Sequence, residues 1–195
     1  MRPGLGKAYG HILAEAVERV IEGQMKPVTG PLRVSFAEAQ LPFEKLPVRK
    51  ELRSLLPSPD GNITRAVKVQ LALLKYGDRR PLLLRYLIHF WQFGSDLKLI
   101  SLSSETVADY ALRFKQAHGC DDTWGSGYND DYWCCIPSRH VWNEGGYEGL
   151  TGMLECDLPG PFTPAVEEII AAKVDELVEE TNGQLRSYPR PSKHA

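Results

Sequence analysis

The sequence predicts an α/β fold in which a mixed β-sheet is flanked by helices. Segments 87–93 and 97–103 are rich in aromatic and branched residues and are separated by Gly-Ser-Asp, a typical hairpin turn. Segments with apolar residues at helical spacing precede and follow this pair, which is the pattern of a sheet covered by helices. We therefore expect the hairpin 87–103 at the centre of the sheet, with helices 104–118 and 164–180 packed on it.

One strand and three helices are expected before the hairpin. Apolar residues recur every three or four positions over 10–22, which predicts an amphipathic helix. Branched and aromatic residues predict a short strand over 32–36, and Pro42 closes it. Two further helices are expected over 46–56 and 63–76, the first ended by a pair of prolines and the second by a glycine.

The part of the chain after the hairpin is expected to begin with a helix. Ser104 is placed to cap this helix, because serine is a preferred N-cap residue, and Gly119 ends it. Segments 123–128 and 131–138 are then expected to form one or two strands. The last helix is expected to be capped by Thr163, with a proline in its first turn.

Length and composition indicate one globular domain. The chain has 195 residues, of which 43% are apolar and 25% are charged, and these values are ordinary for a protein that buries a core. We expect residues 1–182 to form a single domain and residues 183–195 to form a flexible tail.

The charge balance and the apolar runs limit the classes of partner. A formal net charge of −2 gives no long-range attraction for nucleic acid, so no nucleic-acid partner is expected. No apolar run approaches the roughly 18 residues of a membrane span, so no transmembrane segment is expected. The sequence starts without an export signal, which predicts a cytoplasmic protein as written and a secreted or periplasmic one if a signal peptide lies upstream.

The four cysteines are expected to be free, mostly buried thiols. A nucleophile made from Cys134 or Cys135 with His140 would need contact between thiolate and imidazole, which nearness in the sequence does not supply. A structural zinc site that adds Cys120 or Cys156 lacks the paired spacing of such sites. Both site hypotheses are therefore weaker than the hypothesis of inert thiols.

Two other features allow both a structural and a functional interpretation. Glu105 follows a strand and would open the next helix, where an acidic residue complements the helix dipole or stands at a sheet edge as a ligand. The residues alone favour the dipole interpretation. The glycine-rich stretch 144–149 lacks the flanking residues of a phosphate loop, and a tight turn with positive φ is favoured there.

Three stretches resemble a known family. They read "FWQFGSDLKLISLSSETVADYALRFK", "TWGSGYNDDYWCCIPSRHVWNEGGYEGLTGML" and "DLPGPFTPAVEEIIAAKVDEL". In this order they are similar to the carboxyl-terminal half of the neutral/alkaline non-lysosomal ceramidases, in particular the planctomycete-type bacterial branch. The resemblance covers about residues 6 to 182.

The resemblance implies a zinc-dependent amide hydrolase that cleaves ceramide, an N-acyl lipid, into a fatty acid and sphingosine. In the family, two histidines from the first half of the domain hold the zinc together with a glutamate and a tyrosine from the second half. The glutamate stands in a Gly-Glu-x-Thr-like motif and corresponds to Glu105. The tyrosine stands twelve residues before Tyr147, where this chain has Cys135, and Tyr132 lies nearby. Substrate contacts are expected from Tyr147 and Arg139.

The family's paired zinc histidines and its nucleophilic serine belong to a first half that this sequence does not resemble. The resemblance therefore implies an incomplete part of a larger domain, with a missing amino-terminal half as partner, and no hydrolysis by this chain alone. The alternative is a non-catalytic binding or assembly module derived from the same fold. A third hypothesis is an independent hydrolase that uses Cys134 or Cys135.

Overall fold

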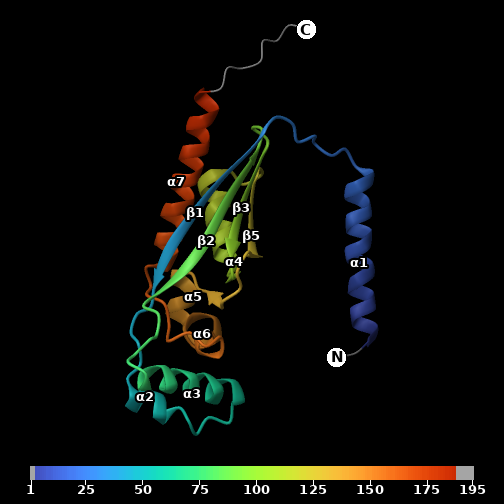
Figure 1. Ribbon diagram of the computed structural model, residues 1–195. Coiled ribbons are helices and arrows are strands. Elements are labelled where there is room, and N and C mark those ends of the chain that lie inside the picture. Colours follow the sequence, from blue (N-terminus) through green and yellow to red (C-terminus); the bar gives the residue numbers. More distant parts are fainter. Residues whose placement is uncertain (1–2, 188–195) are drawn as a thin grey trace.

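The computed structural model describes residues 3–187, with the side chains of residues 4–183 placed (Figure 1). The helices are α1 (Pro3–Glu22), α2 (Arg49–Ser54), α3 (Gly61–Lys75), α4 (Ala108–His118), α5 (Arg139–Glu144), the π-helical turn η1 (Tyr147–Thr151), α6 (Gly152–Glu155) and α7 (Val166–Ser187). The strands are β1 (Leu32–Pro42), β2 (Leu83–Phe93), β3 (Leu97–Ser103), β4 (Glu105–Thr106), β5 (Thr123–Asn129) and β6 (Cys135–Ile136).

The main sheet has the strand order β1-β2-β3-β5, and a small second sheet pairs β4 with β6. β1, β2 and β3 form an antiparallel meander, whereas β5 runs parallel to β3 after the α4 connection. The prediction of an α/β fold with a mixed sheet is confirmed. The predicted hairpin is confirmed as well, and its strands are the two central ones because β1 and β5 lie at the edges.

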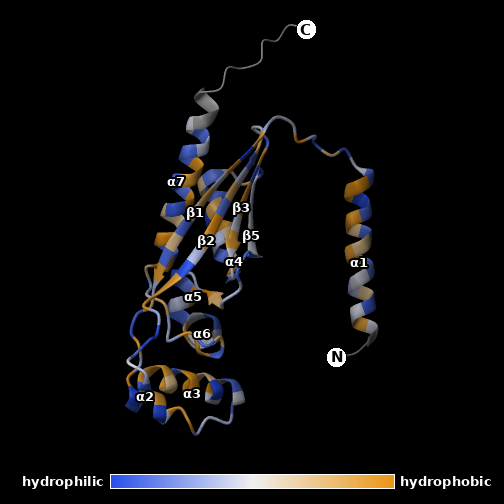
Figure 2. Cartoon of the chain, viewed as in Figure 1, coloured by the Kyte–Doolittle hydropathy of each residue, from blue (hydrophilic) through white to orange (hydrophobic). Residues whose placement is uncertain are grey.

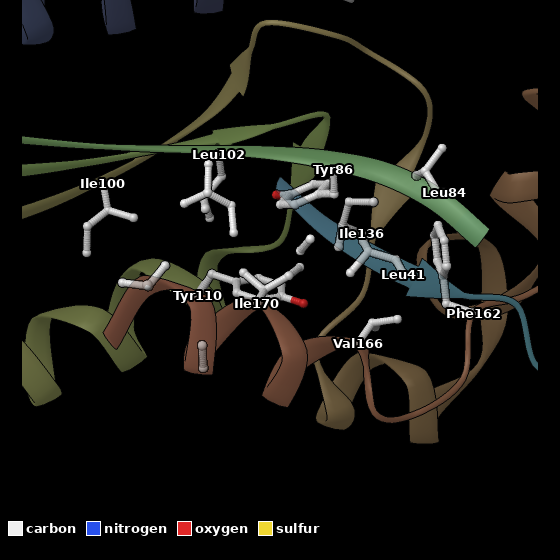
Figure 3. Packing of buried hydrophobic residues seen from close by; sticks show 14 of the residues in the cluster. Leu41, Leu84, Tyr86, Ile100, Leu102, Tyr110, Ile136, Phe162, Val166 and Ile170 are labelled. Carbon is white, nitrogen blue, oxygen red and sulfur yellow. The ribbon is translucent and has the colours of Figure 1, made fainter. Parts of the chain in front are cut away.

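Helices cover one face of this sheet and enclose the core. α7 packs against β1 and β2, and α4 packs against β5. Alternate residues of β2 point into this layer, and Tyr86, Ile88 and Phe90 are completely buried. Figure 3 shows Tyr86 facing Tyr110 and Ile170 across the space between sheet and helices. The period-two burial of β2 explains why a run of aromatic and branched residues forms a strand here.

The opposite face of the sheet presents apolar side chains that remain exposed or half-buried, and we call it the open face. Its apolar side chains are Leu32, Val34 and Phe36 of β1, Leu87, Trp91 and Phe93 of β2, Leu97 and Leu99 of β3, and Trp124 of β5. His89 of β2 lies on the same face, with its Nε2 2.9 Å from Asp130 Oδ2. Strand register aligns four of them in one row across the sheet, Val34, Trp91, Leu99 and Trp124. A row of this kind is an apolar surface suited to packing against another layer.

The predicted cap at Ser104 is wrong. Residues 105–106 form β4, α4 begins at Ala108, and Val107 stands at its N-cap position without a side-chain hydrogen bond. The backbone N–H of Glu105 instead donates to Cys134 O at 3.1 Å. Pairing with β6 therefore replaces the helical turn that capping statistics suggest, and Glu105 does not lie in the first turn of a helix.

Other boundaries also differ from the sequence-based ones. The predicted strand 131–138 is confined to Cys135–Ile136, and the strand predicted over 32–36 continues to Pro42 because its full length pairs with β2. Thr163 does not cap α7, since its hydroxyl has no hydrogen-bond partner among the described residues. α7 continues to Ser187, so residues 183–187 are helical, while 188–195 of the predicted tail lie outside the described residues.

Between residues 3 and 187, no helix is both long enough and apolar enough to cross a membrane.

Candidate functional site

The candidate site is built on the short parallel pair β4–β6 at the carboxyl end of β3. This pairing places Glu105 opposite Cys135, thirty positions later in the chain. Side chains at paired positions of a sheet project to the same side. As a result, the Cys135 thiol donates to Glu105 Oε2 at an Sγ–Oε2 distance of 3.3 Å.

Ser104 fixes the backbone directly before Glu105. Its φ is 60°, in the left-handed region, and the residue is completely buried. The backbone N–H of Ser104 donates to Asp131 O at 2.9 Å, and its carbonyl accepts from the N–H of Tyr128 at 2.7 Å. Its hydroxyl accepts from the backbone N–H of Trp133 at 3.1 Å. The same hydroxyl donates to Asp131 O at 3.4 Å. Four hydrogen bonds therefore tie Ser104 to the segment that carries the other side chains of the site.

Two tyrosines complete the surroundings of the Glu105 carboxylate. The hydroxyl of Tyr132 donates to Glu105 Oε2 at 3.4 Å, and the hydroxyl of Tyr128 is also a hydrogen-bond partner of this carboxylate. The two phenol rings are stacked, with centroids 5.7 Å apart and planes 3° from parallel. Glu105 is therefore an acceptor among three O–H and S–H donors.

These contacts set the protonation states of the cluster. Hydrogen bonds from Tyr128, Cys135 and Tyr132 lower the pKa of Glu105, so it is a carboxylate at neutral pH. Burial, followed by the hydrogen bond to Glu105, raises the pKa of Cys135 to about 12. The pKa of Tyr128 is raised to about 12, chiefly by its bond to Glu105, and that of Tyr132 to about 12, chiefly by burial. One negative charge therefore resides on Glu105 alone.

The donor set suits part of a zinc site. Carboxylate oxygen and thiolate sulfur are both zinc ligands, and two ligands of one tetrahedral zinc stand about 3.6 Å apart at ordinary bond lengths. The observed separation of 3.3 Å between Glu105 Oε2 and Cys135 Sγ is close to this value. Among residues 3–187, however, no group of three or more His, Cys, Asp or Glu side chains is arranged to hold a metal ion. The described residues thus fit two positions of a zinc site, and Cys135 would have to lose its proton to bind.

The two predicted substrate residues occupy different surroundings. Tyr147 begins η1 with 46% of its surface exposed, and its pKa is raised by burial and by the nearby acidic groups and thiols, among them Cys135 and Glu105. Arg139 begins α5, and its backbone N–H donates to Glu167 Oε2 of α7 at 2.6 Å. The structure therefore brings Tyr147 towards the Glu105 cluster, while it joins Arg139 to the start of α7.

The geometry does not favour a Cys–His nucleophile. His140 lies 3.4 Å from Asp109 and 3.3 Å from Glu144, measured between ring nitrogens and carboxylate oxygens. Cys134 is completely buried, and this burial raises its pKa far above the usual thiol value. A protonated thiol without contact to the imidazole lacks the activation that such a nucleophile requires.

The expectation of free cysteines is confirmed, whereas the expectation that most of them are buried holds for Cys134 and Cys135 only, because Cys156 is half-buried and Cys120 is exposed. The interpretation of the glycine-rich stretch is also confirmed. The glycine-rich stretch is a tight turn in which Gly145 and Gly146 have φ values of 73° and 69°. Positive φ at both residues explains the paired glycines without a phosphate ligand.

Tyr128 is the site residue that sequence reasoning missed. It belongs to "GYNDDY", where it precedes Tyr132 by four positions, and a pair of aromatics flanking two aspartates in a loop is a weak signal. The positive φ of Tyr128, 59°, cannot be read from residue type.

Scans of this chain against models of protein families, against curated proteins and against solved structures found no match.

Proposed function

We propose that this chain supplies part of the metal site of a zinc-dependent amide hydrolase resembling the neutral/alkaline non-lysosomal ceramidases. The observation that carries the proposal is the contact between Glu105 and Cys135 at 3.3 Å. The family resemblance assigns zinc ligands to these two positions, which stand thirty residues apart in the sequence. Their apposition is what a shared metal ion would require.

The backbone of Ser104 gives separate support. Its φ of 60° lies in the region that glycine adopts most readily, and the family motif carries glycine immediately before the ligand glutamate. Ser104 therefore has the backbone conformation that favours glycine, although the residue is serine. Its hydroxyl accepts a hydrogen bond from the backbone N–H of Trp133.

In this proposal Glu105 and Cys135 would hold two positions of the zinc, and two histidines of a separate amino-terminal half would hold the others. Zinc, when bound, would activate water for attack on the amide of an N-acyl lipid. Tyr147, which is 46% exposed on η1 where this turn packs against β6, would contact the substrate, and Arg139 stays a predicted substrate residue. With two of four ligands, this chain alone is expected to be inactive.

Cobalt(II) titration tests the shared ligand site, because a cobalt–thiolate bond gives a charge-transfer absorption band. The band should appear with the purified chain, strengthen as pH rises because Cys135 must lose its proton, and vanish in Cys135→Ser and weaken in Glu105→Gln. Cys120→Ser is the matched control, since Cys120 is an exposed thiol outside the cluster. A band that persists in Cys135→Ser would contradict the proposal.

An activity assay tests the missing-half component separately. The purified chain with zinc should not hydrolyse an N-acyl sphingosine. Hydrolysis that survives alkylation of all thiols would contradict both the need for further ligands and the role of Cys135. Hydrolysis abolished by alkylation would favour the cysteine-dependent hydrolase instead.

The second candidate function is a non-catalytic assembly module derived from the same fold, and the open face favours it. Trp124 and Phe36 on this face are 59% and 53% exposed. Apolar sheet surfaces of this extent mark sites of interaction. A module should be monodisperse in solution, whereas a fragment lacking its cover should aggregate and bind a hydrophobic dye.

A further inference from the structure

Helix α1 has an apolar stripe that the rest of its own chain does not cover. Its large apolar side chains recur every three or four residues, with one adjacent pair, so they share one face of the helix. These residues, which form the α1 stripe, are Leu5, Tyr9, Ile12, Leu13, Val17 and Val20, and each is 50–67% exposed. Figures 1 and 2 show α1 standing apart from the body of the molecule with apolar residues along its length.

The α1 stripe and the open face of the sheet match in size. A helix of 20 residues is about 30 Å long, and a strand of 11 residues, such as β2, is about 36 Å long. Among residues 3–187, the helices that pack on the sheet lie on one face, so a helix on the open face would complete a three-layer arrangement with both faces covered.

The linker between α1 and β1 directs the helix away from its own sheet. Its base is attached to the β2–β3 turn, where the backbone N–H and hydroxyl of Thr29 donate to Asp96 Oδ2 at 3.1 and 3.3 Å. Gly30 crosses so close to Gly94 that a Cβ on Gly94 would stand 1.8 Å from Thr29 O. Pro27, just before this attachment, has a fixed φ and favours an extended conformation of Lys26.

We propose that two copies of this chain exchange α1, so that the α1 stripe of each copy packs on the open face of the other. One exchange covers both unpartnered surfaces, and it does so reciprocally, as two-fold symmetry requires. This proposal rests on the assembly-module candidate and names its partner as a second copy of the chain. It does not depend on the metal site.

The size of the resulting interface is that of a stable dimer. The six side chains of the α1 stripe offer roughly 400 Å² of apolar surface per helix at their present exposure. The sheet loses a similar area and the exchange makes two such contacts, so the interface would bury roughly 1,600 Å² in total. Stable complexes bury about 1,200–2,000 Å².

Mass determination in solution, by light scattering on a sizing column, is the first test. The whole chain should be a dimer. Leu13→Glu in the α1 stripe and Trp91→Glu on the open face should each give monomers. Glu18→Gln, on the polar face of α1, is the matched control and should stay dimeric. Circular dichroism verifies that each variant is folded, and Val34→Glu replaces Trp91→Glu if the latter unfolds.

Mixing the two monomeric variants identifies the exchange. The intact α1 of the Trp91→Glu chain can pack on the intact open face of the Leu13→Glu chain. The mixture, measured at high protein concentration, should therefore contain a heterodimer held by one contact of roughly 800 Å², weaker than the unchanged dimer. Sheet-to-sheet packing of two open faces would instead leave Leu13→Glu dimeric by itself, and that result overturns the exchange. Absence of any heterodimer from a mixture of folded variants overturns it as well.

The failure of this inference is distinguishable from the failure of the assembly proposal. A monodisperse monomer, with α1 packed on its own sheet or extended, overturns the exchange and leaves an assembly role with another partner. A heterogeneous aggregate that binds a hydrophobic dye overturns both. Cobalt binding at Cys135 should be the same in Leu13→Glu and in the unchanged chain, because α1 supplies no ligand.

Discussion

The hydroxyl of Ser104 accepts a hydrogen bond from the backbone N–H of Trp133 at 3.1 Å, although the backbone of Ser104 is left-handed with φ of 60°. The side chain of Ser104 therefore has two opposite effects on the free energy of unfolding. Its presence makes the left-handed backbone unfavourable, whereas its hydroxyl gives the Trp133 N–H a hydrogen-bond acceptor. Two substitutions of Ser104 separate these effects.

Replacing Ser104 by alanine and by glycine should destabilise the fold unequally. Both remove the acceptor for the part-buried Trp133 N–H and the 3.4 Å bond from the Ser104 hydroxyl to Asp131 O, a loss of roughly 1 kcal/mol. Only glycine relieves the left-handed strain, worth roughly 1–2 kcal/mol. Urea unfolding should therefore rank unchanged chain and Ser104→Gly close together, with Ser104→Ala lowest. Equal free energies for the alanine and glycine variants would mean that φ at this residue is not strained.

Removal of the hydroxyl should lower the stability of the fold at one buried tyrosine and should not lower it at another. Tyr110 donates to Pro137 O at 3.0 Å, so Tyr110→Phe leaves a buried carbonyl unpaired and should destabilise by about 1–3 kcal/mol. The hydroxyl of Tyr86 has no hydrogen-bond partner among the described residues, so Tyr86→Phe should be neutral or stabilising. Thermal unfolding of both variants checks this, and a large loss in Tyr86→Phe would contradict the packing shown in Figure 3.

Acid should weaken the attachment of α4 to α7 through Glu168. Both carboxylate oxygens of Glu168 accept from Arg113 at 2.7 Å, and these bonds lower the pKa of Glu168. A lowered pKa in the folded state gives stabilisation that is present above the unfolded value, about 4.3, and is lost as pH falls through the folded value. Because the Glu168 side chain is 64% exposed, solvent screening limits the effect to less than about 1 kcal/mol.

The variant Arg113→Met should therefore be less stable than the unchanged chain at neutral pH, and this difference should shrink as the pH falls and Glu168 takes up a proton. Arg49→Met, at an exposed position of α2, serves as control. A deficit in Arg113→Met that stays constant with pH would assign the loss to packing of the arginine stem.

Thiol reactivity should separate the four cysteines. In the native protein a disulfide reagent should modify Cys120 rapidly, because it is exposed, and Cys134 and Cys135 slowly, because both are buried with raised pKa values. The rapid phase should disappear in Cys120→Ser, and all four thiols should react after denaturation. Rapid modification of Cys135 would show that its thiol is more acidic and more open than its contact with Glu105 indicates.

The elements that the sequence predicted well are those whose signals are local. The β2–β3 hairpin combines two period-two segments with a turn of three residues, and every part of that signal lies within 20 positions. The core face of α7 is equally local, since Ile170, Val174 and Val178 recur at helical spacing and are buried.

The site was only partly predictable because its signals are not local. Glu105 and Cys135 were assigned by family resemblance, whereas residue reasoning placed Glu105 in a helix. The pairing of β4 with β6 joins segments thirty residues apart, and two-residue strands leave no periodic pattern. The positive φ values of Ser104 and Tyr128 follow from tertiary hydrogen bonds rather than from residue preference.

The bond between Ser35 Oγ and Thr181 Oγ1, 3.0 Å long, joins residues 146 positions apart. The inner side of β1 is therefore covered by α7, the last described helix to be translated. During synthesis, β1 and the β2–β3 hairpin leave the ribosome well before the helix that shields them. We expect the nascent chain to depend on chaperones for this interval, and folding to be limited by the late closure of this long-range contact. Truncation within α7 should consequently impair the yield of folded protein more than removal of α1.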